Sequence, residues 1–291
     1  MDYRTILVAV SGGSASVGAV ELACRLAHRF ASHLEAFHVR VDARELAFVP
    51  ADGFSAPLAG NVIELAIKDA AENAARARAI VDAAAMRHAL PIREAPPPIG
   101  MSPALLRQPT LAWHEETGYA AARVAGRARL FDLLVLGRSG RDADEPYGDA
   151  VEEALLGSGR PVLLAPVEPP KVAGDSIALA WNDSPEAARV LAGAMPLLLK
   201  AKTVHLLSVG DTGAPALAAH LAWYGIRAEA HDVYPVGGVG AGELVLSAAR
   251  DVGADMLVMG GYGHAPWREV MFGGATREVI GTSLLPVLLS H

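Results

Sequence analysis

Short apolar runs alternate with longer amphipathic segments along almost the whole chain. The apolar run Thr5–Val10 precedes an alanine-rich helix expected over Ser16–Ser32, and the run Ile177–Trp181 precedes one over Pro185–Lys200. Continuous apolar runs of this length are typical of strands that are buried on both faces of a parallel sheet. Strands and helices in alternation form right-handed βαβ units, so the pattern predicts an α/β fold with a mainly parallel sheet.

The same pattern occurs twice, which predicts an internal duplication. Four segments of the first half match four segments of the second half in the same order. The matching pairs are Ile6–Ser11 with Ile177–Asn182, His33–Val39 with Thr203–Val209, Phe131–Gly137 with Ala254–Gly260, and Arg160–Ala165 with Leu285–Ser290. A stretch rich in Pro and Gly, Glu168–Gly174, is typical of a domain boundary. We therefore predict two tandem Rossmann-like domains, 1–168 and 175–291, each a sheet flanked by helices.

The two halves differ in the middle. The first half has a long helix expected over about Val62–Ala89, and then a Pro-rich stretch, Pro91–Pro109, which cannot be helical. A strand is expected next, over Leu111–Glu116. The second half has shorter counterparts, with helices expected over Ala214–Tyr224 and Glu243–Val252 and a strand over Arg227–Val233.

Composition narrows the class of protein. With 291 residues, 52% of them hydrophobic, the chain can fill two cores. A net charge of −7 and an aromatic content of 5% argue against a nucleic-acid partner. No apolar run approaches the roughly 20 residues of a membrane helix, and the start of the chain lacks a signal-peptide pattern. The single cysteine, Cys24, fits a reducing compartment, so we expect a cytoplasmic protein without a membrane partner.

A glycine motif lies near the end of the second half. Met259–Gly263 comes directly after the expected strand Ala254–Val258, and Gly273–Arg277 follows nine residues later. Glycines let backbone N–H groups approach a ligand without obstruction by Cβ, and the start of the helix expected over Ala275–Thr282 favours an anion. The motif predicts a phosphate site, to which His264, Arg268 and Arg277 could add positive charge. The alternative is a tight turn whose glycines serve packing alone.

The first half carries a weaker copy of this motif. Gly137 and Gly140 are present, but Ala150 and Val151 occupy the later positions, and the branched side chain of Val151 would fill the space of a phosphate. Four acidic residues between them would repel phosphate: Asp142, Asp144, Glu145 and Asp149. We therefore expect a degenerate site in the first half.

These segments and motifs together resemble the universal stress protein family in its tandem two-domain form. The family signature is Gly, two residues, Gly, nine residues, Gly, and then Ser or Thr. Gly260, Gly263 and Gly273 fall on its three glycines, while Gly274 stands in the place of the hydroxyl residue and Thr276 offers a hydroxyl two positions later. The resemblance spans nearly the whole chain and implies domains of the adenine nucleotide alpha hydrolase-like kind.

The resemblance implies a site for ATP or a related nucleotide, with Mg²⁺, in the second half. In the family an Asp after the first strand holds the adenine side; here Ser11 and Asn182 stand in its place. An Asn can still donate and accept hydrogen bonds, without the charge. The implied nucleotide-binding residues are Ala180, Asn182, Val209, Met259, Gly260, Gly263, Gly273, Gly274, Ala275 and Thr276.

Other polar residues are better explained by structure than by chemistry. Ser14 or Ser16 is expected to cap the first helix, and Asp183-Ser184-Pro185 to begin a helix with Pro at its first position. The ten histidines show no metal-binding spacing, so no metal site is predicted. Cys24 is expected to be a buried hydrophobe, and Trp181 either borders the ligand crevice or fills the core. With no general base or activated nucleophile in sight, at most slow ATP hydrolysis is expected.

The function implied by the resemblance is nucleotide-dependent regulation in stress adaptation. An interaction module without nucleotide, acting through the long helix and the Pro-rich segment, is the alternative; an enzyme would need further motifs after the first strand, and none is visible. The last strands, Pro161–Val167 and Pro286–Ser290, are expected to pair within the chain, because each would otherwise be an exposed apolar edge. A homodimer of the whole chain is compatible with this pairing.

Overall fold

The computed structural model describes residues 2–42, 56–102, 107–138, 150–168, 171–209, 213–234, 236–261 and 274–291. The elements of the first half are β1 Thr5–Ala9, α1 Ala15–Phe30, β2 His33–Arg40, α3 Ala56–Arg87, β3 Thr110–Thr117, α4 Ala120–Ala128, β4 Leu133–Gly137, α5 Ala150–Gly157 and β5 Val162–Ala165. Those of the second half are β6 Ser176–Trp181, α6 Pro185–Leu198, β7 Thr203–Val209, α7 Ala214–Ala222, β8 Ala228–Val233, α8 Ala241–Asp251, β9 Met256–Gly260, α9 Gly274–Thr282 and β10 Val287–Ser290.

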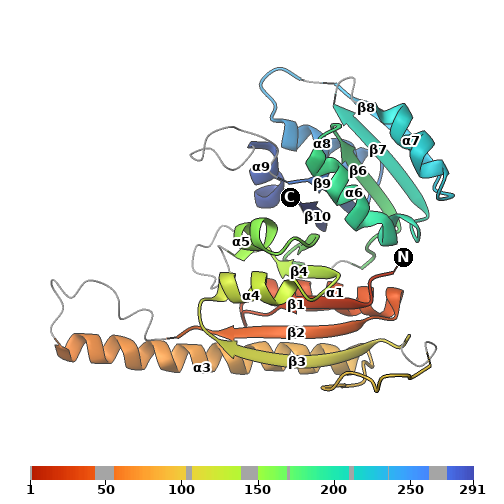
Figure 1. Cartoon of the computed structure of the whole chain (residues 1–291). Coiled ribbons are helices and arrows are strands. Elements are labelled where there is room, and N and C mark those ends of the chain that lie inside the picture. Colours follow the sequence, from red (N-terminus) through yellow and green to blue (C-terminus); the bar gives the residue numbers. More distant parts are fainter. Residues whose placement is uncertain are drawn as a thin grey trace.

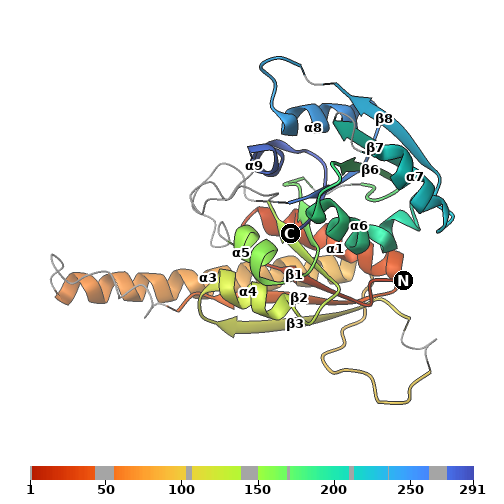
Figure 2. The same ribbon diagram turned by 45° about the horizontal axis from the view of Figure 1, so that its top comes forward.

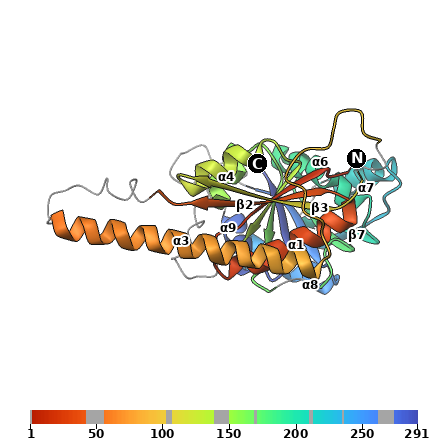
Figure 3. The same cartoon turned by 90° about the horizontal axis from the view of Figure 1, so that it is seen from below.

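The strands form one continuous sheet (Figure 1), in the order β3-β2-β1-β4-β5-β10-β9-β6-β7-β8. Neighbouring strands are parallel within each half, and β5 and β10 pair antiparallel where the halves meet. Each half therefore repeats one strand order, which confirms the predicted α/β class. The strands fan out in Figure 3 because each is twisted relative to its neighbour.

The joint between β5 and β10 is the pairing that the sequence predicts. Leu288 lies opposite Leu163, and both side chains are fully buried. They belong to a hydrophobic cluster that contains residues of both halves, and a second such cluster lies on the other face of the sheet. Helices α1, α3, α6 and α7 contribute to the first cluster, and α4, α5, α8 and α9 to the second. Figure 2 shows α4 and α5 in front of β1 and β2, with α1 and α3 behind them.

The long helix α3 begins earlier than the sequence predicts, at Ala56. Pro57 lies in the first turn of α3, where proline is tolerated because its missing N–H has no partner within the helix. Ala77, Val81 and Ala84 bury one end of α3 in the first cluster, and the other end extends past the sheet (Figure 1). No helix in the described parts of the chain is long and apolar enough to span a membrane.

The duplication extends to individual side chains. Asp132, just before β4, accepts hydrogen bonds from the N–H groups of Arg4 and Thr5 at 2.7 and 3.0 Å. Asp255, just before β9, accepts from the N–H groups of residues 174–176 at 2.6 to 3.1 Å. In each half one carboxylate therefore fixes the start of the first strand against the fourth, since hydrogen bonds to a charged acceptor are the stronger ones.

Candidate functional site

Residues of the predicted nucleotide site lie together at the carboxyl edge of the sheet in the second half. Ala180 on β6 pairs in register with Met259 on β9. Gly260 ends β9, Val209 ends β7, and Asn182 directly follows β6. This is the edge at which open α/β sheets bind their ligands. The structure therefore brings these five residues to the place that the resemblance implies.

The start of α9 supplies the remaining described residues of the predicted site. Gly274, the first residue of this helix, is exposed, and nothing lies within 4 Å of the position that a Cβ would take. Ala275 is half-buried, while Thr276 is only 4% exposed, so its side chain is directed largely into the protein. Four other predicted residues lie outside the described residues: Gly263, His264, Arg268 and Gly273.

Gly260 has a packing role that is independent of any ligand. A Cβ at this position would lie 2.8 Å from the backbone nitrogen of Ala187 and 2.9 Å from the carbonyl carbon of Glu186, both in α6. Gly137 is in the same situation in the first half, where a Cβ would overlap the carbonyl group of Ala15 in α1. The first glycine of each motif thus allows a helix to pack closely on a strand end, as the packing alternative requires.

The turn from β6 to α6 is ordered by its own side chains. The Oδ1 atom of Asn182 accepts hydrogen bonds from Ser184 Oγ at 2.8 Å and from Ser184 N–H at 3.3 Å. Ser184 Oγ in turn accepts from the N–H of Ala187 at 3.1 Å, which confirms Ser184 as the N-cap with Pro185 after it. Asp183 adopts a left-handed conformation with φ of 55°. Asn182 and Asp183 are both exposed and accessible to a ligand.

The corresponding turn of the first half is covered. Ser11 and Gly12 are buried, and a Cβ on Gly12 would overlap the backbone carbonyl of Asn73 in α3. Ser16 Oγ accepts from the N–H groups of Ser11 and Gly12 at 3.0 and 3.2 Å and closes the turn. Ser14, one of the two expected capping residues, is the N-cap residue of α1, but its side chain makes no cap hydrogen bond. Helix α3 thus occupies the space in which a ligand would contact this turn.

The weaker copy of the glycine motif, in the first half, lies partly outside the described residues. Gly140 and the acidic residues Asp142, Asp144, Glu145 and Asp149 lie outside the described residues. Ala150, which begins α5, is buried, and Val151 is half-buried. Val151 packs against the second hydrophobic cluster, so it contributes to the core.

Two charged residues near this edge were missed by sequence reasoning. Arg138, after β4, is 9% exposed, and burial lowers the pKa of its guanidinium. Its Nη1 donates to the carbonyl of Ile280 in α9 at 3.4 Å, which is a contact between the halves. Glu186, in the first turn of α6, is 3% exposed and pairs with Arg189 at 2.8 Å. An acid after Ser-Pro is an ordinary helix start, and no sequence signal distinguishes either residue as part of a site.

The other isolated candidates have structural explanations. Cys24 is fully buried, as expected of a buried hydrophobe, and burial raises the pKa of its thiol to about 12. Trp181 is partly buried and packs against the first hydrophobic cluster.

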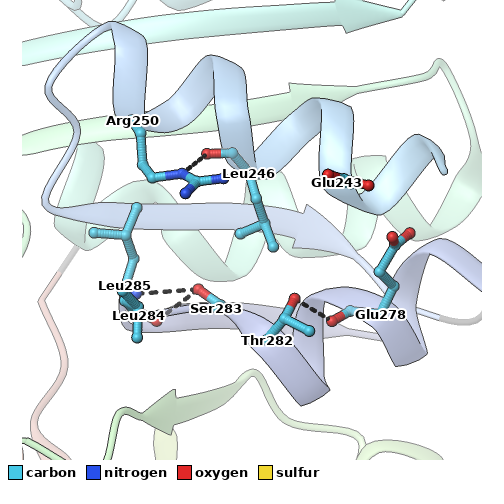
Figure 4. A pocket seen from close by; sticks show the side chains of 8 residues that line it. All are labelled: Glu243, Leu246, Arg250, Glu278, Thr282, Ser283, Leu284 and Leu285. Carbon is cyan, nitrogen blue, oxygen red and sulfur yellow. Dashed lines mark hydrogen bonds between the residues drawn. The ribbon is translucent and has the colours of Figure 1, made fainter. Parts of the chain in front are cut away.

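Two concave surfaces lie away from the predicted site. A groove of about 390 Å³ runs between α8 and α9, with Arg250 at the end opposite Glu243 and Glu278 (Figure 4). A larger cavity of about 550 Å³ is lined partly by the Pro-rich segment and includes Arg4 and His33, at the amino ends of the strands. None of the predicted nucleotide-binding residues lines either surface.

Comparison with solved structures identifies the fold. Over 100% of its length the chain matches 99% of a universal stress protein from Archaeoglobus fulgidus DSM 4304, with a TM-score of 0.68 and 14% identity. It also matches a protein from Pseudomonas aeruginosa UCBPP-PA14 that has been proposed to be a universal stress protein (TM-score 0.56, 16% identity, 99% of this chain and 93% of that chain). A functionally unknown protein from Pseudomonas aeruginosa PAO1 is similar too (TM-score 0.54, 15% identity, coverage of 99% and 92%).

No family model and no curated protein matches the sequence. The structural matches extend over both halves of the chain. The chain therefore has the universal stress protein fold over its whole length, as the resemblance implies.

Replacing the N-cap Ser184→Ala is expected to lower the free energy of unfolding by about 1 kcal/mol, because the N–H of Ala187 loses its acceptor. The same change removes the hydroxyl that donates to Asn182. Urea unfolding followed by circular dichroism measures the loss. An unchanged midpoint and slope would show that the cap does not contribute.

Proposed function

We propose that the chain is a universal stress protein that binds ATP or a related nucleotide, with Mg²⁺, in its second half and regulates stress adaptation in the cytoplasm. The observation that carries the proposal is the contrast between the two β–α turns. Asn182 and Asp183 are exposed beside the end of β9, whereas Ser11 and Gly12 are buried under α3. The glycine spacing and the full-length likeness to a universal stress protein support the same assignment.

The residues of the second half suit the two ends of a nucleotide. The exposed start of α9 at Gly274 offers N–H groups and a favourable dipole to phosphate oxygens. The Nδ2 group of Asn182 has no hydrogen-bond partner within the described ranges, so it can donate to a base or a ribose. The first half, 1–168, would then be a structural domain and the second, 175–291, the binding domain. We propose binding without efficient catalysis.

Thermal unfolding with and without millimolar Mg-ATP tests the proposal. We expect Mg-ATP to raise the unfolding temperature of the wild type, since a ligand that binds only the native state stabilises it. The variant Gly274→Val places a branched side chain at the start of α9 and is expected to weaken ATP binding at least about tenfold, or by about 1.4 kcal/mol.

The matched control is Gly281→Val in the same helix, where a Cβ also meets nothing within 4 Å. This control should keep the shift caused by Mg-ATP. The nucleotide proposal fails if the wild type shows no shift, or if both variants bind as the wild type does. Addition of Asn182→Asp, which restores the family's acidic residue, is an internal check that should strengthen binding.

A protein-interaction role is the second candidate function. Helix α3 extends past the sheet and exposes Leu65 and Ile67, which are 59% and 57% exposed. Exposed apolar side chains on an extended helix suit contacts with another protein. Absence of any Mg-ATP effect on the wild type would favour this second function.

A further inference from the structure

Three residues with metal-ligand chemistry meet on one face of the sheet, far along the chain from the glycine motif. His205 lies on β7, and Glu229 and His231 lie on the neighbouring strand β8. His205 pairs in register with Glu229, and His231 is two positions further along β8, so all three side chains are on the same face. One ligand atom of each lies within 4.8 Å of the other two.

The spacing of these atoms fits a single small cation. His205 Nδ1 is 3.1 Å from His231 Nε2 and 3.7 Å from an oxygen of Glu229. Zinc is bound by imidazole nitrogen and carboxylate oxygen at about 2.0–2.2 Å, which places neighbouring ligands of a tetrahedron about 3.3–3.5 Å apart. Movements of a few tenths of an ångström would therefore complete three corners of a tetrahedron.

The surroundings provide both rigidity and access. The side chain of His205 is 10% exposed, that of Glu229 is 61% exposed, and His231 is half-buried. Beneath them on the same face, Leu207 and Val233 belong to the second hydrophobic cluster. Because β8 ends the described sheet, an ion can enter from that side and keep a fourth position for water.

We propose that His205, Glu229 and His231 bind one divalent transition-metal ion of the zinc class. Imidazole ligands suit zinc and its neighbours, whereas Mg²⁺ and Ca²⁺ prefer sites made of oxygen atoms. The sequence shows no such site because its ligands are separated by a helix and become neighbours only through the pairing of β7 with β8. The competing explanation for the short distance is a hydrogen bond between the two imidazoles, which requires no ion.

Calorimetric titration of the EDTA-treated, nucleotide-free chain with Zn²⁺ alone distinguishes these explanations. We expect one ion per chain in the wild type. Second-shell partners of metal sites already contribute about 10–100-fold to affinity, so loss of a direct ligand in Glu229→Gln or His231→Ala should cost at least about 100-fold. Both positions are exposed or half-buried, so the variants should fold, which circular dichroism verifies.

The control His220→Ala changes an exposed histidine of α7 outside the cluster and should bind Zn²⁺ as the wild type does. Absence of stoichiometric Zn²⁺ binding by the wild type would overturn the proposal. It would also be overturned if folded Glu229→Gln and His231→Ala variants retained wild-type affinity, or if Mg²⁺ displaced Zn²⁺ at equal concentration. The result does not depend on nucleotide binding, so the two proposals can fail separately.

Discussion

The variant Leu288→Ala is expected to lower the free energy of unfolding by about 2–5 kcal/mol, the usual cost of a cavity left by a buried leucine. Leu288 is fully buried in β10, directly opposite the equally buried Leu163 of β5. This pair lies at the only antiparallel joint of the described sheet, where neighbouring strands of the two halves meet. The lost contacts are therefore between the halves as well as within one of them.

The destabilisation should extend to both halves. The hydrophobic cluster that contains Leu288 includes Ile6 and Val8 of β1 together with Ile177 and Leu179 of β6. Hydrogen exchange followed by mass spectrometry can measure the opening of β1 and β6 separately in the same variant. We expect exchange in both strands to accelerate. Acceleration limited to the second half would show that the halves unfold as independent units.

A matched control for this variant lies four residues earlier in the chain. Leu284 is 80% exposed, so Leu284→Ala removes the same atoms without leaving a cavity. Its free energy of unfolding should stay within about 0.5 kcal/mol of the wild type. If both variants lost the same stability, burial at the joint would not be the cause.

The mainly parallel sheet of each half and the joint were predictable because each depends on a local pattern repeated in the sequence. Apolar runs that alternate with alanine-rich helices indicate parallel strands. Each of the two segments that end at Ala165 and Ser290 has an apolar edge, which the other segment can cover by pairing with it. The earlier start of α3 was not predicted, because Gly60 and Asn61, directly before Val62, have low helix propensity and favour a start after them.

The covering of the first β–α turn could not be predicted either. It depends on contact between Gly12 and Asn73, which are far apart in the chain, and no periodic pattern encodes where a long helix crosses a sheet. The same holds for His205 and Glu229, which become neighbours through strand pairing. The candidate site was predictable as a set of positions at one sheet edge. Which half of the chain keeps the carboxyl ends of its strands accessible depends on tertiary packing.

The variant Gly260→Val is expected to lower the free energy of unfolding by about 3 kcal/mol even without nucleotide, as overpacking of a close contact does. Its side chain would be forced against the backbone of Glu186 and Ala187, which cannot move without shifting α6. Gly137→Val should have a similar cost in the first half, where α1 makes the same approach and no ligand is proposed. Urea unfolding in nucleotide-free buffer measures both.

Comparison with Gly274→Val then separates the two uses of glycine within one motif. A Cβ on Gly274 meets nothing within 4 Å, so this variant should unfold within about 0.5 kcal/mol of the wild type while it weakens Mg-ATP binding. Gly260→Val should show the opposite pattern, in which the loss of stability is the larger effect. Wild-type stability of nucleotide-free Gly260→Val would contradict the packing role, and Gly260 would then be needed for the ligand alone. Packing glycine and ligand glycine are therefore distinguishable because one faces a helix backbone and the other faces open space.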